Sequence, residues 1–194
     1  MAELLRTSPL EAWTDAFGRL PGTVGITAEP YVAMVDVRLG TLGPEAAAAL
    51  DVELPTAPNT WVPTDVGWAV WLGPDEWLLS STTEAAEELE ARMRAAVLPL
   101  GGSAADVSAQ RIGLRLTGAR VRDVLAKGCS IDLHPRVFGR GSSAQTTLGR
   151  AGVVLLALSG TGNEYLVLVR SSFAGYLADW LLDAALEFGS THES

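Results

Sequence analysis

The chain has 194 residues, with 14 Lys and Arg, 23 Asp and Glu, and a single cysteine, Cys129. A net charge of −9 argues against nucleic acid as a partner, because a phosphate-binding face needs a basic excess. The length suffices for a buried core, and one cysteine excludes an intrachain disulfide, so we expect a cytoplasmic protein. The longest apolar run, Val153–Leu158, is too short to span a bilayer, and the first residues lack a signal-peptide pattern, so we expect no membrane contact.

Hydrophobic spacing and turn residues predict the elements of the first hundred residues. After an N-terminal helical arm over residues 1–22, we expect a strand, a short helix, two strands joined by a turn, and a longer helix: Tyr31–Leu39, Pro44–Leu50, Trp68–Leu72, Trp77–Leu79 and a helix after Ser81. Residues 52–66 are expected to form a loop, because Pro55, Pro58 and Pro63 disfavour a helix and a ladder strand.

The second hundred residues repeat this order. The predicted elements are a strand, a helix, a strand-like stretch, a hairpin and a last helix: Val107–Leu116, Ala119–Lys127, Gln145–Leu148, Ala151–Leu158 with Glu164–Arg170, and Phe173–Phe188. Gly128 follows the first helix of this half, and we expect it at the C′ position with a positive φ.

The repetition predicts an α+β fold in which two similar βαββα-like halves form one domain. This domain is expected to cover residues 23–189, with pseudo-repeats at about 23–100 and 101–189. Residues 190–194 are expected to form a flexible tail.

Charge is unevenly distributed along the chain. Residues 1–100 hold 5 Arg against 15 acidic residues, and residues 101–194 hold 9 cations against 8. Eight of these nine lie between Arg111 and Arg150, where Asp123 and Asp132 are the only acidic residues. Such a cluster indicates either a solvated face or a docking surface for an acidic partner or an anion.

Residues that catalysis or cofactor binding requires are scarce. Residues 139–144 fit G-x-G-x-x-A, but a strand-like stretch follows them where a dinucleotide site needs a helix, so we expect a turn. Two histidines and one cysteine do not predict a metal site. Cys129 is expected to be a buried small hydrophobe, and His134, before Pro135, a turn residue. We therefore expect no catalytic, cofactor-binding or metal-binding residue in this chain.

Six tryptophans are many for this length. Four fit the predicted core, whereas Trp13 and Trp61 do not. Aromatic side chains outside a core are enriched at interfaces, so we expect these two at an interface.

Several motifs resemble a known family. They are PNTW, WLGPDEWLL, DVSAQR, LAKGCSIDLHPRVF, AQT and RSSFAGYLADWLLDAALEFG. They occur in order from about Pro58 to Gly189, and they resemble the gamma subunit of heterotetrameric sarcosine oxidase. That family is related to the glycine-cleavage T-protein, whose folate-binding domain has the expected fold.

The resemblance implies a noncatalytic structural gamma subunit that associates with alpha, beta and delta subunits. The implied complex oxidatively demethylates sarcosine, or another N-methyl amino acid, forms peroxide and passes the one-carbon unit to tetrahydrofolate. FAD, FMN, NAD, tetrahydrofolate and zinc are implied in the other subunits, and none in this chain alone. The family motifs single out possible interface residues, namely Trp61, Lys127, Gly128, Asp132, His134, Pro135, Phe138, Gln145 and Thr146.

Two alternatives remain open. One is a folate-binding one-carbon transferase, with an anion near Arg111, Arg115 or Arg140. The T-protein resemblance weighs against it, because that family has an acidic residue in the strand that aligns with the apolar residues 152–157. The other alternative is a free-standing interaction domain. Ser142-Ser143 departs from the gamma-subunit pattern, in which a small residue and Cys often precede AQT.

Overall fold

The structure is a computed structural model that describes residues 8–189. The predicted tail 190–194, with His192, and the start of the predicted N-terminal arm lie outside these residues. The chain divides into two compact units. Unit 1 comprises the residues up to Tyr31, residues 112–139 and the residues from Thr146 onward, and unit 2 comprises residues 32–111 and 140–145.

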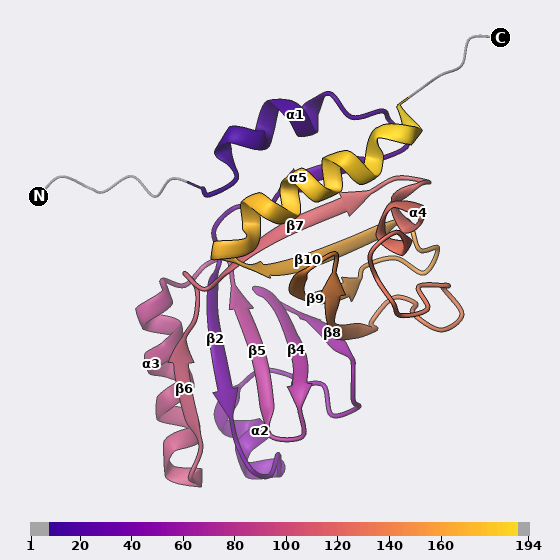
Figure 1. The fold of residues 1–194 in the computed structure, drawn as a ribbon. Helices are drawn as coiled ribbons and strands as arrows, with labels where there is room; N and C mark the ends of the chain where they lie inside the picture. The colour runs from indigo at the N-terminus through magenta and orange to yellow at the C-terminus, as the bar shows by residue number, and fades with distance from the viewer. Residues whose placement is uncertain (1–7, 190–194) are drawn as a thin grey trace, which may run out of the picture. The chain divides into compact units, whose positions relative to one another are not determined.

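Ten strands form two five-stranded sheets (Figure 1). Sheet 1 has the order β1-β7-β10-β9-β8, and sheet 2 has the order β3-β4-β5-β2-β6. Sheet 1 consists of β1 (Gly25–Ala28), β7 (Arg111–Thr117), β10 (Glu164–Arg170), β9 (Ala151–Ala157) and β8 (Ser143–Leu148). Sheet 2 consists of β3 (Trp61–Thr64), β4 (Gly67–Gly73), β5 (Glu76–Ser81), β2 (Ala33–Arg38) and β6 (Ser103–Asp106). The pairs β1–β7, β9–β10, β2–β5, β2–β6, β3–β4 and β4–β5 are antiparallel.

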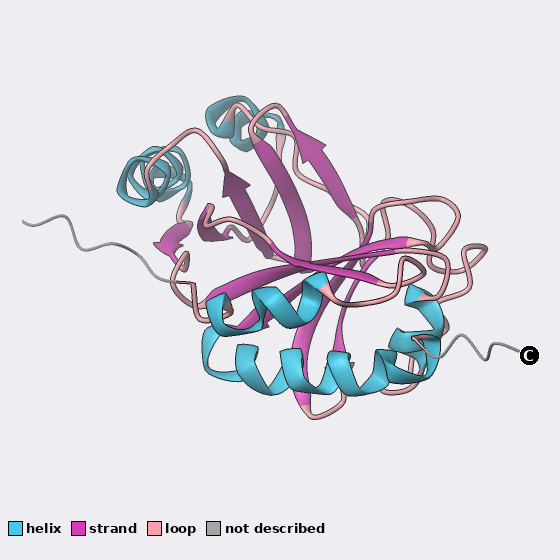
Figure 2. Cartoon of the chain, turned by 90° about the horizontal axis from the view of Figure 1, so that it is seen from above, coloured by secondary structure: helices cyan, strands magenta, loops and turns pink. Residues whose placement is uncertain are grey.

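Five α-helices accompany the strands. They are α1 (Thr14–Gly18), α2 (Pro44–Leu50), α3 (Ala86–Val97), α4 (Val121–Ala126) and α5 (Ala174–Ala185). Short 3-10 turns adjoin three of them at Glu11–Trp13, Leu98–Leu100, Ser171–Phe173 and Leu186–Phe188. Figure 2 shows these helices against the strands. None of the helices within residues 8–189 is long and apolar enough to cross a membrane.

The two halves of the chain have the same element order, which confirms the predicted two-half α+β fold. The first half runs β2-α2-β3-β4-β5-α3, and the second runs β7-α4-β8-β9-β10-α5. Equivalent strands occupy equivalent places, since β3-β4-β5-β2 in sheet 2 matches β8-β9-β10-β7 in sheet 1. Each sheet is completed by a short strand from the other half of the sequence, β6 beside β2 and β1 beside β7. The shared order βαβββα has one strand more than the predicted βαββα pattern, and β1 and β6 each add another.

The core of unit 2 lies between its helices and one face of sheet 2. Alternation along β2 turns Ala33, Val35 and Val37 toward this core, as the period of two requires. From α3, Leu89 and Met93 complete it at helical spacing, and both are at most 1% exposed. Burying such side chains contributes roughly 1.5–3 kcal/mol each. Figure 1 shows α3 running alongside β6.

In unit 1, α1 and α5 lie side by side (Figures 1 and 2). Trp13 joins them, because its Nε1 donates to Asp179 Oδ1 at 2.6 Å. A Cβ at Gly175 would lie 3.0 Å from the Trp13 ring, so any larger residue there would press on the indole. The predicted interface role of Trp13 stays a prediction, but Trp13 also has this intramolecular use. Sequence spacing missed this use because the partner positions lie more than 160 residues away.

Residues 61–64 form a strand, so the predicted loop over residues 52–66 is wrong in this part. Trp61 pairs with Val70, and Pro63 pairs with Trp68. β3 is an edge strand, where a proline without an N–H is tolerated because one side of the strand has no neighbour to accept it.

Candidate interaction surface

The motif loop, residues 128–139, follows α4 and is shaped by its own polar groups. The Asp132 Oδ1 accepts a hydrogen bond from the His134 backbone N–H at 2.8 Å. The His134 Nδ1 accepts from the backbone N–H of Arg136 at 3.2 Å. The His134 carbonyl accepts from the N–H groups of Val137 and Phe138 at 2.8 and 2.9 Å. Asp132 and His134 thus fix successive turns of the loop, which agrees with the predicted turn role of His134.

Stacking between Phe138 of the loop and Tyr165 of β10 anchors the loop. Phe138 is 6% exposed, and its ring stacks on Tyr165 with centroids 6.4 Å apart and planes 13° apart. The Tyr165 hydroxyl donates to the Leu133 carbonyl at 3.4 Å. Burial raises the pKa of Tyr165, and the positive charge of Arg122 opposes this rise. Phe138 is therefore an internal anchor of the loop, not an exposed contact.

Two further side chains of the motif face inward. Cys129 is buried, as expected from the sequence. Pro135 packs on the β9–β10 turn, where a Cβ at Gly162 would lie 2.9 Å from the proline Cγ. Gly162 has φ of +70°, so glycine is required there for both conformation and space.

Gly128 does not have the predicted positive φ, and this prediction is wrong. The helix ends through Lys127 in a right-handed conformation, and the Gly128 N–H donates to the Leu125 carbonyl. A Cβ at Gly128 would lie 2.4 Å from Trp180 and 2.8 Å from the Gly149 nitrogen. Glycine is needed because an indole and a neighbouring backbone occupy the space of a side chain.

Lys127 holds the end of α5. Its Nζ donates to the Ala184 carbonyl at 2.5 Å, pairs with Glu187 at 2.7 Å and lies 5.0 Å from the centre of the Phe188 ring. Arg120 contacts the same ring at 5.7 Å. A cation at a helix C-terminus is stabilised by the helix dipole, so Lys127 has an internal structural use.

The remaining motif residues do not belong to the loop. Trp61, in β3, is 9% exposed, and its N–H donates to the Gly141 carbonyl at 2.9 Å. Gln145 is exposed, and its Nε2 donates to the Leu72 carbonyl at 2.7 Å. Both contacts join the strand pair β3–β4 to residues 140–145, all within unit 2. Thr146 is half-buried in β8.

The outward side of the motif loop carries exposed charged side chains and one exposed aliphatic side chain. Asp132, His134 and Arg136 are exposed, and Val137 is 66% exposed. Within the described chain, Arg120 pairs with Asp123 and Lys127 pairs with Glu187, whereas Arg122 and Arg136 make no ion pair.

A different arginine is neutralised inside unit 1. Arg115 lies between two carboxylates, with Nε 2.7 Å from Glu29 Oε1 and one amino nitrogen 2.7 Å from Glu164 Oε1. The hydrogen bonds that Arg115 donates to Glu29 and Glu164 raise its pKa, against the lowering effect of burial. A bound anion at Arg115 would compete with both carboxylates.

Unit 2 holds a carboxylate pair on sheet 2. Arg38 lies 2.8 Å from Glu76 and 3.7 Å from Asp36. Burial, together with the hydrogen bond and negative charge of Glu76, raises the pKa of Asp36 to about 6, although Arg38 and Arg111 oppose the rise. Asp36 therefore binds a proton more readily than an ordinary aspartate.

The G-x-G-x-x-A sequence at residues 139–144 is a turn that leads into β8, as predicted. Within residues 8–189, no group of three or more His, Cys, Asp or Glu side chains is placed to hold a metal ion.

Comparison with known proteins identifies the family. The sarcosine oxidase, gamma subunit family matches residues 40–187. Sarcosine oxidase subunit gamma of Corynebacterium sp. (strain P-1) is 37% identical over 193 residues, covering 96% of this chain and 93% of the relative. The corresponding subunit of Arthrobacter sp has the same identity and coverage.

Solved structures agree with this similarity. A chain of the heterotetrameric sarcosine oxidase from Corynebacterium sp. U-96, in complex with pyrrole 2-carboxylate, matches with a TM-score of 0.85 and 30% identity, covering 98% of this chain and 100% of that chain. The glycine cleavage system aminomethyltransferase T from Bartonella henselae shares the fold, with a TM-score of 0.58, 14% identity, and coverage of 87% of this chain and 48% of that chain. This chain belongs to the sarcosine oxidase gamma subunit family.

Proposed function

We propose that this chain is the noncatalytic structural gamma subunit of a heterotetrameric sarcosine oxidase. Its family membership and its similarity along nearly the whole length of a chain from such a heterotetramer support this proposal. The partners would be alpha, beta and delta subunits, and the complex would oxidatively demethylate sarcosine and transfer the one-carbon unit to tetrahydrofolate. FAD, FMN, NAD, tetrahydrofolate and zinc would be held by those other subunits.

One observation carries the noncatalytic part of the proposal. The side chains of the motif loop that are suited to chemistry have structural uses. Asp132 accepts from a backbone N–H, His134 Nδ1 accepts from another, and Cys129 is buried at the end of α4. A general base needs its lone pair directed at a substrate proton, and here the paired oxygen and nitrogen are directed at the loop backbone.

The folate-transferase alternative has less support. The strand β9, which aligns with the T-protein strand that carries an acidic residue, contains only apolar residues and is buried except at Gly152. Arg115 is already engaged by Glu29 and Glu164. The similarity to aminomethyltransferase T, at 14% identity, concerns the fold alone.

Turnover per assembled complex tests the proposal. Cys129→Ala, Asp132→Ala and His134→Ala would each be assembled with the other subunits, and free subunits would be removed before the assay. We expect sarcosine turnover per complex to stay within about twofold of wild type, even where the yield of complex falls. Loss of a true general acid or base costs about 10²–10⁴-fold. A drop of that size in an intact complex would refute the noncatalytic role.

A further inference from the structure

We propose that the outward side of the motif loop, formed by Arg136 and Val137, docks an acidic segment of another subunit together with Arg122 of the preceding helix α4. This inference rests on the proposed function, because it requires a complex. It specifies the chemistry of the contacting segment, which carries carboxylates opposite the two arginines and an aliphatic side chain over Val137.

Charge is the first argument. Three cations of unit 1 are neutralised within the chain, since Arg115, Arg120 and Lys127 each have a carboxylate partner. Arg122 and Arg136 have no such partner in the described chain. Arginines with unused guanidinium donors match planar carboxylates, which they bind through two parallel hydrogen bonds. The chain as a whole has a net charge of −9, so this local excess of positive charge is specific to the region.

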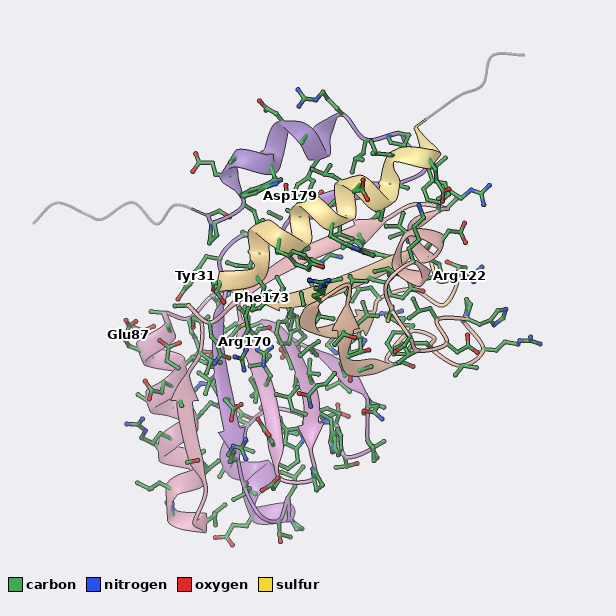
Figure 3. The ribbon with its side chains drawn as sticks, in the orientation of Figure 1. Tyr31, Glu87, Arg122, Arg170, Phe173 and Asp179 are labelled. Carbon is green, nitrogen blue, oxygen red and sulfur yellow. The ribbon has the colours of Figure 1, made fainter. Side chains whose placement is uncertain are left out.

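Arg122 lies in α4, the helix that leads into the motif loop. Its charge acts on Tyr165, and the Tyr165 hydroxyl contacts the Leu133 carbonyl inside the loop. Figure 3 shows Arg122 beside α4, well separated in this view from Arg170 at the far end of β10. Arg170, which belongs to the same unit, therefore serves as a control away from α4.

Shape is the second argument. Val137 is 66% exposed although its neighbour Phe138 is 6% exposed, so a buried anchor presents an aliphatic side chain to solvent. Three hydrogen bonds fix residues 134–138 in this conformation. A pre-ordered loop loses little conformational entropy on binding, which favours its use as a docking surface. Ordered loops of this length without secondary structure are uncommon and usually functional.

A chemical cross-link tests the inference directly. Lys127 is the only lysine of the sequence, and its ammonium group is engaged within the chain. The variant Arg136→Lys keeps the charge and introduces an amine that carbodiimide couples to a carboxylate in direct contact. We expect the assembled complex of this variant to yield a covalent adduct between Lys at position 136 and an Asp or Glu of another subunit, located by peptide mass spectrometry. Arg170→Lys serves as the matched control and should give no such adduct.

Charge reversal gives the second measurement. We expect Arg136→Glu to weaken association with the other subunits at least tenfold at low salt, and Arg170→Glu to change it less than twofold, because like charges in contact are unfavourable. The wild-type affinity should fall as salt rises, and the variant should show a smaller salt dependence.

The outcomes separate the two proposals. Equal affinities for both charge-reversal variants, with no adduct at position 136 in an assembled complex, would overturn the docking surface and leave the proposed function intact. Failure of the wild-type chain to associate with any of the other subunits would overturn both.

Discussion

The motif loop and the segment 51–60 occupy equivalent places in the two halves of the chain, since each connects the first helix of its half to the next strand. In both, an aromatic side chain from an equivalent strand contacts a carbonyl of the connection. Trp77, in β5, donates through Nε1 to the Pro55 carbonyl at 2.8 Å. Tyr165, in β10, donates through its hydroxyl to the Leu133 carbonyl at 3.4 Å. Both rings are at most 2% exposed.

The two connections differ in charge. Residues 51–60 contain Asp51 and Glu53 and no cation, whereas the motif loop contains His134 and Arg136 with Asp132. The aromatic contact is therefore a requirement of the fold that both halves meet. The exposed arginine is present in one half only, so the fold does not require it. We therefore expect the partner-binding surface at the motif loop.

Truncation of the ring in the first half should have the largest effect. Trp77→Ala removes a buried indole and its hydrogen bond, so we expect the free energy of unfolding to fall by about 3–5 kcal/mol. Urea denaturation of the purified chain measures this change. Trp77→Phe should cost less, because the ring volume is partly retained. An effect of Trp77→Ala below about 1 kcal/mol would show that this contact does not stabilise the first connection.

A substitution at Gly128 tests the packing at the junction between α4 and the motif loop. We expect Gly128→Val to lower the free energy of unfolding by about 1–3 kcal/mol, because the new side chain overlaps Trp180. Gly160→Ala is the control, since a Cβ there has no neighbour within 4 Å. In a Trp180→Leu background the cost at Gly128 should shrink, and an unchanged cost would show that crowding by the indole is not its cause.

Tyr165→Phe isolates the polar part of the contact in the second half. The stacking on Phe138 is retained and only the hydroxyl is lost, so we expect a loss of stability of about 0.5–1.5 kcal/mol. The 3.4 Å hydrogen bond of Tyr165 is longer than the 2.8 Å bond of Trp77, which favours the low end of this range. A loss above 3 kcal/mol would indicate that the hydroxyl has a larger role than its contact with Leu133 explains.

The smallest expected effect on stability concerns the surroundings of Glu76 and Glu164, which precede Trp77 and Tyr165 in the sequence. Glu76 pairs with Arg38, and Glu164 pairs with Arg115, but only the first pair has the additional carboxylate Asp36 with a raised pKa. The folded protein binds this proton more tightly than the unfolded chain, whose Asp36 has an ordinary pKa. Stability from Asp36 is therefore greatest at low pH and declines as pH rises from about 4 to 6.

The variant Asp36→Asn should remove this decline and make the protein more stable than wild type at pH 7. Glu84→Gln is the opposite case, because the hydrogen bond from Arg92 lowers the pKa of Glu84. Stability from Glu84 is present at neutral pH and is lost as pH falls below its ordinary pKa. Unfolding curves between pH 3 and 7 would distinguish the two, and the same pH profile for wild type and Asp36→Asn would contradict the assigned role of Asp36.

Local patterns in the sequence predicted most of the fold. Alternation in Ala33–Arg38, helical spacing in Leu89–Val97 and the apolar runs of β9 and β10 match the elements of the structure. The prediction missed β3 because Pro63 was taken to exclude a strand. Proline is excluded from a central strand, but β3 lies at an edge. Short strands such as β1 and β6 carry too few residues for their period to show.

Details of the surface were harder to predict, because they depend on residues distant in sequence. The sequence cannot show that Trp180 fills the space beside Gly128, or that Asp179 and Gly175 receive Trp13. The family motif singled out a loop in which some side chains are buried and others are exposed, but the motif did not distinguish the two. Phe138 is an anchor, whereas Arg136, which the motif did not single out, is exposed without an ion pair.

Hydrogen–deuterium exchange of the whole chain, free and in the assembled complex, compares the two connections directly. The central claim predicts that residues 131–138 gain protection on assembly and that residues 51–60 change little. Residues 134–138 are already hydrogen-bonded within the chain, so the informative quantity is the further slowing of exchange in the complex. Slower exchange in residues 51–60, with no change in the motif loop, would contradict the assignment of the second half as the docking side.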